Sequence, residues 1–573
     1  MGHDPAAALV GEPRDASPGN AQVLAAIEEG KLARTRSLGG IPRQAIQFCL
    51  AAASADWKDV DCVAVASRPV TAWMHTTAFR MLRAPFSPVR SAYFINKVMG
   101  ELGRELNNFR ILREMAASPD RLESFDHHLS HAASSFFASP HDHALIVSLD
   151  EQGDGQAGLV AVGEGTAIRE LSRIPLPHSL GWFFSRVTSL LGFHSRIDEH
   201  KTQWLGLSAE PSLADVFVAM LRRHPQGPPH LNSQYFDGSF GGAFPFSSKF
   251  YRCIGVAPPR AGAAPHIPEA ARATIAASLQ QACATVLCDW LESLRKQTGH
   301  TSLCLAGGLF LNPLIVYAIE RTTGFTKVFV QPAAGNEGTA LGAAWLAWYA
   351  RRKDQHLAPP VDTYWGPGYS NEEIKRVLDN CKASYHWCDS DDQKIESTVQ
   401  LLHAGRIVAW FQGRAEFGPR ALGNRSLLAS PWSPYVKENL NDYVKHRESY
   451  RPFALAVPEE DAAEYFDCTP NTRFMATMAV ARDKARALFD SAESAFISRQ
   501  GLVRLHVVAR DANPLLWKLL KRCGQAAPAP MLVNTSFNLF GEPLVVSPRD
   551  AVRSFYCSGT DALVAGSFLL TKR

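Results

Sequence analysis

The sequence predicts an α/β protein made of two domains, and three observations support this prediction. With 573 residues, the chain is longer than a single hydrophobic core usually accommodates. The segments HALIVSLD (143–150) and SLCLAGGLF (302–310) have the apolar composition of buried strands that end in turns. Residues 271–297 instead repeat apolar side chains with helical spacing. Strands that alternate with helices are typical of α/β domains, whose sites lie at strand ends.

A segment rich in proline and glycine, residues 356–370, marks the expected boundary between the domains. It acts as a linker between a first domain, residues 1–355, and a second domain, residues 371–573. The second domain also mixes both kinds of element, because RIVAWF (406–411) has the pattern of a strand and PLLWKLLKRC (514–523) that of a helix. We therefore expect an α/β fold on both sides of the linker.

Composition restricts the classes of function. The net charge of +4 is small for this length, and the chain has no basic stripe of the kind that RNA binding favours, so we expect no nucleic-acid partner. No apolar run approaches the ~20 residues that a membrane helix needs, and the first residues lack the pattern of a signal peptide. The 11 cysteines form no C-x-x-C pair, which favours buried free thiols over a zinc site. We expect a cytoplasmic enzyme without a membrane partner.

Two histidines with helical spacing indicate a metal site. In SFDHHLSHAASSFF, His127 and His131 stand one helical turn apart, so both imidazoles face the same side of a helix and can bind one cation. The predicted strand that ends at Asp150 offers a carboxylate followed by glycines. In the alternative interpretation, one histidine caps or packs and the other is solvated. The apolar neighbours and the nearby aspartate favour the metal site.

Two glycine-rich turns, residues 306–312 and 333–344, lie where a strand is expected to meet a helix. Glycine lets backbone N–H groups approach a phosphate or a ring edge, and a helix N-terminus favours negative charge. Each turn is a weak signal alone, because tight turns also use glycine for steric reasons. Neither turn is a Walker motif, so ATP would have to bind in a different way.

The second domain carries a cluster of basic residues interleaved with Gly, Ser and Asn. Guanidinium groups suit the bidentate recognition of phosphate or carboxylate groups. The alternative is a solvated basic face whose charges pair with Glu416 and Glu448. The Gly-Pro, Leu-Gly and Pro-Phe neighbours of the arginines favour a binding site instead. The members of the cluster are Arg414, Arg420, Arg425, Lys445, Arg447, Arg451 and Arg504.

Taken together, these segments resemble the carbamoyltransferase family of antibiotic-tailoring enzymes and nodulation proteins. The resemblance runs in the expected order from residue 2 to about residue 546. It implies an N-terminal domain of the ASKHA type, similar to the ATPase of tRNA threonylcarbamoylation, and a C-terminal YrdC-like α/β domain. The matching motifs are GHDPAAALV, AAIEEGKLARTR, HHLSHAAS, SLDEQGDG, AGGLFLN, GRAEFGPRALGNRSLL, KHRESYRPFA and NTSFN.

The resemblance also implies an ATP-dependent O-carbamoyltransferase. In this family, the C-terminal domain makes carbamoyl adenylate from ATP and carbamoyl phosphate, and the N-terminal domain transfers the carbamoyl group to an alcohol. By resemblance, His3 is the base that activates the acceptor hydroxyl, because an alcohol is a poor nucleophile. Lys445 would neutralise charge during activation. The expected acceptor is a hydroxyl group of a small natural product, as in antibiotic biosynthesis.

Further roles follow from the resemblance position by position. His127, His131 and Asp150 would bind a divalent metal ion, Fe²⁺ by resemblance or Mg²⁺. The fourth ligand of the family is an aspartate, and this position holds Asn336 in the chain. The other implied contacts are Arg36, Ser179, Gly308 and Asn312 with carbamoyl adenylate, Arg420 and Arg451 with the ATP phosphates, and Arg504 and Asn538 with carbamoyl phosphate.

Several positions depart from the family pattern. Asn336 can ligate through its carbonyl oxygen but adds no charge, so we expect weaker metal binding or a different ion, with Glu337 as an alternative ligand. Phe540 stands where the family can place an arginine for carbamoyl phosphate, and residues 198–208 form a longer turn than usual. These departures leave two alternatives: carbamoylation of tRNA or protein, and a nucleotide-binding relative with impaired catalysis. The acceptor and the oligomeric state stay open, a homodimer included.

Overall fold

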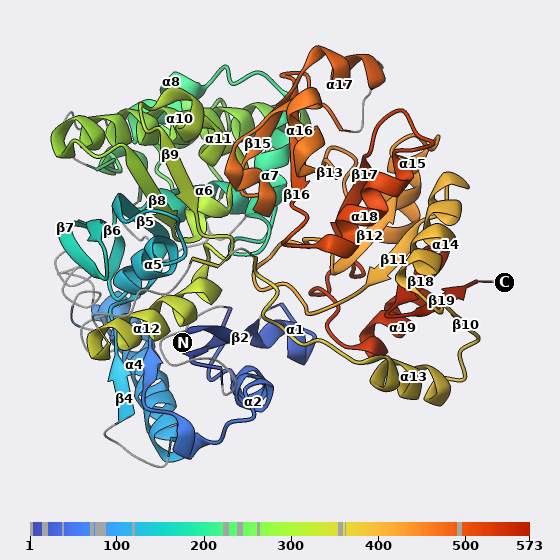
Figure 1. Ribbon diagram of the computed structural model, residues 1–573. Helices are drawn as coiled ribbons and strands as arrows, with labels where there is room; N and C mark the ends of the chain where they lie inside the picture. The colour runs from blue at the N-terminus through green and yellow to red at the C-terminus, as the bar shows by residue number, and fades with distance from the viewer. Residues whose placement is uncertain are drawn as a thin grey trace.

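The computed structural model contains two large β-sheets, one built from residues 143–330 and one from residues 386–571 (Figure 1). None of the described helices is long and apolar enough to cross a membrane. The described residues are 4–13, 21–36, 39–68, 74, 88–116, 121–221, 228–237, 245–260, 264–352, 359–360, 362–489 and 496–572.

The N-terminal sheet has five strands in the order β7-β6-β5-β8-β9. The first three form an antiparallel meander, and β8 and β9 continue the sheet in parallel with β5. This order agrees with the ASKHA-type fold expected for this part, and the α/β class is confirmed. The strands are β5 (His143–Gly153), β6 (Gln156–Glu164), β7 (Ala167–Pro175), β8 (Ser302–Ala306) and β9 (Lys327–Val330).

Alternating side chains of β5 divide the N-terminal core into two layers. Leu145, Val147 and Leu149 pack against one set of helices, whereas Ala144 and Ile146 pack against another, as the two-residue period of a strand requires. In Figure 1, the sheet lies between these layers. The first layer contains α6 (Leu180–Leu190), α10 (Glu269–Thr298) and α11 (Pro313–Thr322), and the second contains α5 (His127–Phe136) and α12 (Asn336–Arg351).

Two small sheets precede the N-terminal sheet in the chain. One is an antiparallel pair, and α12 packs against its first strand. The other is a parallel pair. Their elements are β1 (Ala6–Gly11), β2 (Gln22–Glu28), β3 (Val63–Val65) and β4 (Leu122–Ser124), accompanied by α1 (Glu29–Ala33), α2 (Arg43–Ala52) and α4 (Pro88–Met115).

The C-terminal sheet has ten strands in the order β10-β19-β18-β11-β12-β17-β13-β16-β15-β14. It is mixed, since β11 pairs in parallel with β18 and antiparallel with β12. The strands are β10 (His386–Trp387), β11 (Val408–Phe411), β12 (Arg425–Ala429), β13 (Ala454–Pro458), β14 (Phe466–Asp467), β15 (Met478–Ala481), β16 (Leu502–Val508), β17 (Leu532–Ser536), β18 (Ala562–Ala565) and β19 (Phe568–Thr571).

Helices cover both faces of the C-terminal sheet. On one face, Val408 and Trp410 share a core with Leu516 and Leu519, and on the other face Phe411 shares a core with the last helix. The α/β class expected for this part is therefore confirmed. The helices are α13 (Asn371–Asn380), α14 (Asp391–His403), α15 (Val436–Glu438), α16 (Glu459–Tyr465), α17 (Asp483–Leu488), α18 (Pro514–Cys523) and α19 (Pro548–Tyr556).

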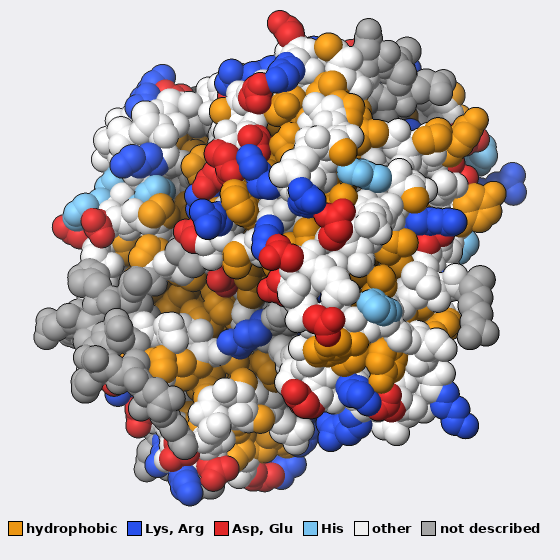
Figure 2. Space-filling view, turned by 45° about the vertical axis from the view of Figure 1, so that its right-hand side comes forward, with side chains coloured by type: hydrophobic (Ala, Val, Ile, Leu, Met, Phe, Trp, Pro, Cys, Tyr) orange, Lys and Arg blue, Asp and Glu red, His pale blue; other side chains and the backbone are white. Residues whose placement is uncertain are grey.

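Buried polar contacts join the two parts. The ammonium group of Lys31 donates to the carbonyl oxygens of Glu416 and Gly418, each at 2.7 Å. Trp365, inside the segment predicted to be a linker, is 7% exposed and packs with Phe417. Figure 2 shows basic and acidic side chains intermingled on one face of the molecule. The parts thus meet through specific contacts.

Candidate functional site

The structure brings His127, His131 and Asp150 together at the N-terminus of α5. Asp126 caps this helix by accepting a hydrogen bond from the Leu129 N–H at 3.0 Å, which fixes where the helix begins. Oδ2 of Asp150 lies 3.3 Å from Nε2 of His127 and 3.4 Å from Nε2 of His131. One potential ligand atom from each of these three residues lies within 4.8 Å of the others. This spacing suits a single metal ion.

The surroundings of this cluster fit a metal ion. The ring nitrogens of His131 are buried without a well-aligned hydrogen bond, and the amide oxygen of Asn336 is buried without a partner. The amide of Asn336 lies beside His131, and burial lowers the pKa of this histidine, which keeps the imidazole in its neutral, metal-binding form. A metal ion would supply the partners that these buried atoms lack.

Glycines leave room for the cluster. A Cβ on Gly153 would lie 1.9 Å from the ring of His127. A Cβ on Gly308 would lie 2.9 Å from Oδ1 of Asp150. The close approach of the backbone therefore requires glycine at both positions. The backbone of Gly308 therefore packs directly against the Asp150 carboxylate.

Carboxyl groups beside the metal cluster were not identified as a group from the sequence. Glu337 follows Asn336 in α12 and is 6% exposed, and burial raises its pKa to about 8. Burial and the nearby Glu28 raise the pKa of Asp4 to about 6. These groups come from different elements, so only the tertiary structure brings them together.

One cavity of about 1560 Å³ connects the metal cluster with arginines of the C-terminal part. His127, Asp150 and Asn336 line it on one side, and Arg420 and Arg504 line it on the other. Further lining residues are Arg36, Gly308, Asn312, Arg447, Arg451 and Asn538. Most of the residues expected to contact substrates thus surround a single space.

Like charges crowd this cavity. Burial and the neighbouring Arg451 lower the pKa of Arg420 to about 10. Burial and the guanidinium groups around it hold the pKa of Arg504 well below its usual value. Nε of Arg504 is buried without a hydrogen-bond partner among the described residues, and the guanidinium lies 5.6 Å from the ring of Trp204. Arginines without anionic partners attract anions such as phosphate groups.

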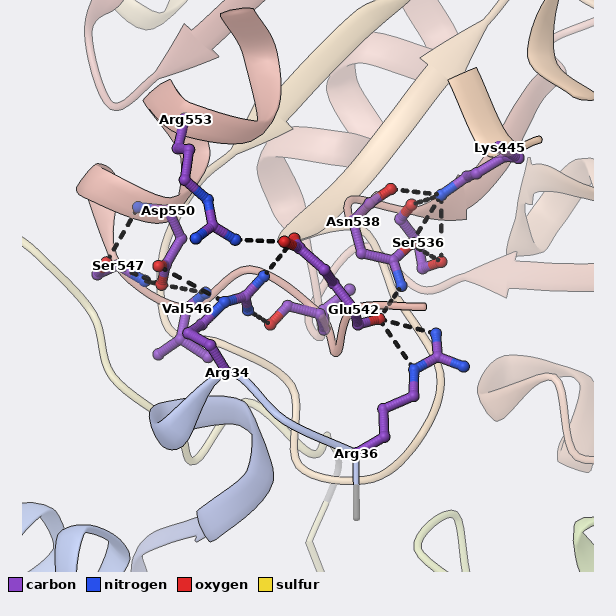
Figure 3. Close-up of polar contacts among 11 residues, drawn as sticks. Arg34, Arg36, Lys445, Ser536, Asn538, Glu542, Val546, Ser547, Asp550 and Arg553 are labelled. Atoms are coloured by element: carbon purple, nitrogen blue, oxygen red, sulfur yellow. Dashed lines mark hydrogen bonds and ion pairs between the residues drawn. The ribbon is translucent and has the colours of Figure 1, made fainter. Parts of the chain in front are cut away.

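Lys445 and Asn538 contact each other directly (Figure 3). Nζ of Lys445 donates to Oδ1 of Asn538 at 2.8 Å and to the carbonyl oxygen of Asn538 at 3.2 Å. It also donates to the carbonyl oxygen of Ser536. Burial, together with nearby arginines, holds the pKa of this lysine well below its usual value. The lysine is 6% exposed and lies behind the cavity wall, where it supports the turn that carries Asn538.

Other predicted contact residues are engaged within the protein. The hydroxyl of Ser179 caps α6 and donates to the carbonyl oxygen of Asp150 at 2.9 Å. The amide of Asn312 caps α11 and donates to Gln280 at 2.7 Å. His3 lies outside the described residues.

Two arginines of the predicted basic cluster bind backbone rather than facing the cavity. Arg425 donates to the carbonyl oxygens of Gln412 at 2.5 Å and Pro367 at 2.9 Å, and its guanidinium lies 3.8 Å from the ring of Phe411. Arg414 likewise donates to the carbonyl oxygens of Gly366 and of Leu24 in β2, each at 3.0 Å. Both arginines therefore stabilise the loops that precede β12.

His200 also lines the cavity but was not identified from the sequence. Its Nδ1 lies 3.1 Å from the carbonyl oxygen of Ile197. Burial and the neighbouring Arg451 hold its pKa well below the usual value, so the imidazole is neutral. The structure places His200 in helix α7 (Glu199–Leu205) and not in the long turn expected at residues 198–208, and that expectation does not reveal that His200 faces arginines.

Several known proteins are similar to this chain in sequence. An uncharacterized protein of Synechocystis is 32% identical over 604 residues, which cover 100% of this chain and 95% of the relative. Nodulation protein NolNO of Sinorhizobium fredii is also 32% identical, with 100% of this chain and 79% of the relative covered. 3'-Hydroxymethylcephem-O-carbamoyltransferase of Streptomyces clavuligerus is 34% identical over 45% of this chain and 46% of the relative.

One solved structure and two family profiles match parts of the chain. The solved structure of HypF from T. kodakarensis matches 44% of this chain and 40% of its own at 18% identity, with a TM-score of 0.25. The profile described as carbamoyltransferase N-terminus matches residues 2–345, and the profile described as carbamoyltransferase C-terminus matches residues 399–572. The chain therefore belongs to the carbamoyltransferase family.

Proposed function

We propose that this chain uses ATP to convert carbamoyl phosphate into carbamoyl adenylate and then transfers the carbamoyl group to a hydroxyl of a small molecule. The observation that carries this proposal is the single cavity that joins a group of arginines, most of whose charge lacks an acidic partner, to the His127, His131 and Asp150 cluster. An intermediate could pass between them without leaving the protein. The relative that acts on a hydroxymethylcephem supports a small hydroxyl acceptor.

The arginines suit the activation step. Arg420 and Arg451 would bind the phosphates of ATP, and Arg504 together with Asn538 would bind carbamoyl phosphate. Water would first release inorganic phosphate from carbamoyl phosphate and leave carbamate. Attack of the carbamate oxyanion on the α-phosphate of ATP would then expel pyrophosphate, and fixed guanidinium groups would stabilise the charge on the transferred and leaving oxygens. Lys445 acts indirectly in this arrangement, because it holds Asn538 and Ser536 from behind the wall.

The metal cluster suits the transfer step. His127, His131, Asp150 and Asn336 would hold a divalent metal, and their two imidazoles favour Fe²⁺ over Mg²⁺. When bound, the metal would act as a Lewis acid toward the carbamoyl oxygen. Gly308 would lie beside the carbamoyl group, and Arg36 would hold the adenylate phosphate. His3 would accept the proton of the acceptor hydroxyl.

Pyrophosphate release tests the activation step. Purified protein supplied with ATP and carbamoyl phosphate should release pyrophosphate, and Arg504→Ala should abolish this release because the bound anion loses its partner. Arg510→Ala is the matched control, since Arg510 is exposed and also lies over a tryptophan ring, at 5.0 Å. His3→Ala should leave this step intact. Absence of pyrophosphate with every divalent metal tried would refute the proposed activity.

A further inference from the structure

A single backbone oxygen receives three hydrogen bonds in the turn between β17 and α19. The carbonyl oxygen of Glu542 accepts from Nε of Arg36 at 3.0 Å and from Nη2 of Arg36 at 2.7 Å. It also accepts from Nδ2 of Asn538 at 2.7 Å. Figure 3 shows both side chains directed at this oxygen, with Asn538 above it and Arg36 below it in the view. Arg36 belongs to the N-terminal part and Asn538 to the C-terminal part.

The side chain of Glu542 anchors this turn. Its Oε2 lies 3.1 Å from Nη2 of Arg34, and its Oε1 pairs with Arg553 of α19. Arg34 adds a hydrogen bond to the carbonyl oxygen of Leu544 at 2.5 Å and lies 3.6 Å from Asp550. The Arg34 and Glu542 side chains are 15% and 26% exposed, so solvent screens this pair less than a pair on the open surface.

The contacts continue to the buried lysine. Asn538 uses its amide nitrogen for Glu542 and its amide oxygen for Lys445 at 2.8 Å and the Ser536 hydroxyl at 2.8 Å. A displacement of the Glu542 carbonyl would therefore rotate the Asn538 amide and release Arg36. Lys445 would lose one of its acceptors in the same movement.

We propose that Glu542 is a positioning residue: its carboxylate, held between Arg34 and Arg553, fixes the carbonyl oxygen that orients Arg36 and Asn538 in the cavity. This inference rests on the proposed function, in which Asn538 helps to bind carbamoyl phosphate and Arg36 holds carbamoyl adenylate. Glu542 itself touches neither substrate. It aligns one residue from each part through a shared atom.

The carboxylate is essential to this arrangement. Glutamine at position 542 would offer one oxygen to one arginine and would turn an NH₂ group toward the other. The preceding residue, Gly541, has a φ of +77°, so the turn depends on a conformation that other residues rarely adopt. Glycine also adopts many other backbone conformations. Without the ion pairs of the Glu542 carboxylate, the turn would therefore be free to move. Arg420 and Arg451 make no hydrogen bond to this turn.

The test compares Glu542→Gln with wild type in the pyrophosphate assay. We expect the KM for carbamoyl phosphate to rise about tenfold, because small displacements of a binding group are costly. The KM for ATP should stay unchanged, and loss of the ion pairs should lower the melting temperature by a few degrees at most. Glu542→Asp, which keeps the charge, should recover part of the loss. Glu464→Gln is the matched control, because Glu464 forms an exposed ion pair with Lys484 elsewhere in the C-terminal part.

Two results would overturn the role of Glu542: an unchanged KM for carbamoyl phosphate, or an equal rise in both KM values. Calorimetric titration of carbamoyl phosphate into wild type and Glu542→Gln separates this inference from the proposed function. If wild type released no pyrophosphate, the proposed activity would fall. The titration would still decide about Glu542: weaker binding by the variant would support its role, and equal or absent binding in both proteins would refute it.

Discussion

Among single residues, Asn336 has the most direct effect on the charge of the metal cluster. Its amide oxygen is buried without a hydrogen-bond partner among the described residues. An amide can ligate a metal through its oxygen but contributes no negative charge. The cluster therefore relies on Asp150 for its anionic ligand. A carboxylate at position 336 would add a second charge at the same place.

We expect Asn336→Asp to tighten metal binding, by about tenfold, because ligand charge raises affinity for divalent ions. Metal content after dialysis, together with a competition titration against a chelator, measures this change. Asn380→Asp introduces the same chemistry at an exposed site and should have no effect. Equal metal content in wild type and Asn336→Asp would argue against Asn336 as a ligand.

The sequence predicted site residues correctly where their spacing along one helix decides which side they face. His127 and His131 were predicted to face one side of a helix, and the structure places both beside Asp150. Ser179 and Asn312 are expected to contact carbamoyl adenylate, and in the structure both side chains cap helices while Asn312 also lines the cavity. Whether a polar side chain faces a cavity or a backbone group depends on neighbours that are distant in the sequence.

Between elements, the approach of α5 to the end of β5 determines the geometry of the metal cluster. Gly153 is the contact point, because a Cβ there would lie 1.9 Å from the ring of His127. The backbone N–H of His127 also donates to Asp154 at 2.9 Å. The helix start and the strand end are thus held together with no space for an additional methyl group.

We expect Gly153→Ala to displace His127, to weaken metal binding and to reduce the free energy of unfolding by about 1–3 kcal/mol, as overpacking of a tight contact does. Metal content and thermal unfolding report these effects. Gly103→Ala is the control, because its Cβ would meet nothing within 4 Å. Helix α4, which contains Gly103, should become slightly more stable. Unchanged metal content in Gly153→Ala would contradict the claim that the tight contact between Gly153 and His127 positions the metal ligand.

The elements themselves were largely predictable. Helical spacing predicted residues 271–297, where α10 spans Glu269–Thr298, and residues 514–523, which form α18. Apolar composition predicted the strand at 143–150, where β5 runs from His143 to Gly153. Periodicity is a local property of the sequence. The convergence of Arg36 on the turn that holds Asn538 and Glu542 was not predictable, because Arg36 and Glu542 are 506 residues apart in the sequence.

At the scale of the whole molecule, the two parts enclose a cavity whose positive charge is only partly paired. Arg504 lies on β16 of the C-terminal sheet, and its ring contact, Trp204, comes from the N-terminal part. Burial and the arginines around it hold its pKa well below the usual value. The native state therefore binds a proton at Arg504 less readily than the unfolded state does. Between the native and the unfolded pKa of Arg504, the free energy of unfolding rises with pH. Below the native pKa, the cost of burying the charged guanidinium is fully present.

Arg504→Met should therefore have opposite effects without and with an anion. Without ligand, we expect the variant to melt at a higher temperature than wild type near neutral pH, because the unfavourable buried charge is gone. Inorganic phosphate should stabilise wild type, by about 2.7 kcal/mol at a concentration of about 100 times its Kd, and should stabilise Arg504→Met much less. Thermal unfolding at constant ionic strength, with sodium chloride replacing phosphate, measures both differences. Arg510→Met, at an exposed position, should behave as wild type in both conditions. A variant that melts below wild type without ligand would mean that Arg504 stabilises the empty cavity, and the charge in that cavity would then serve the fold rather than anion binding.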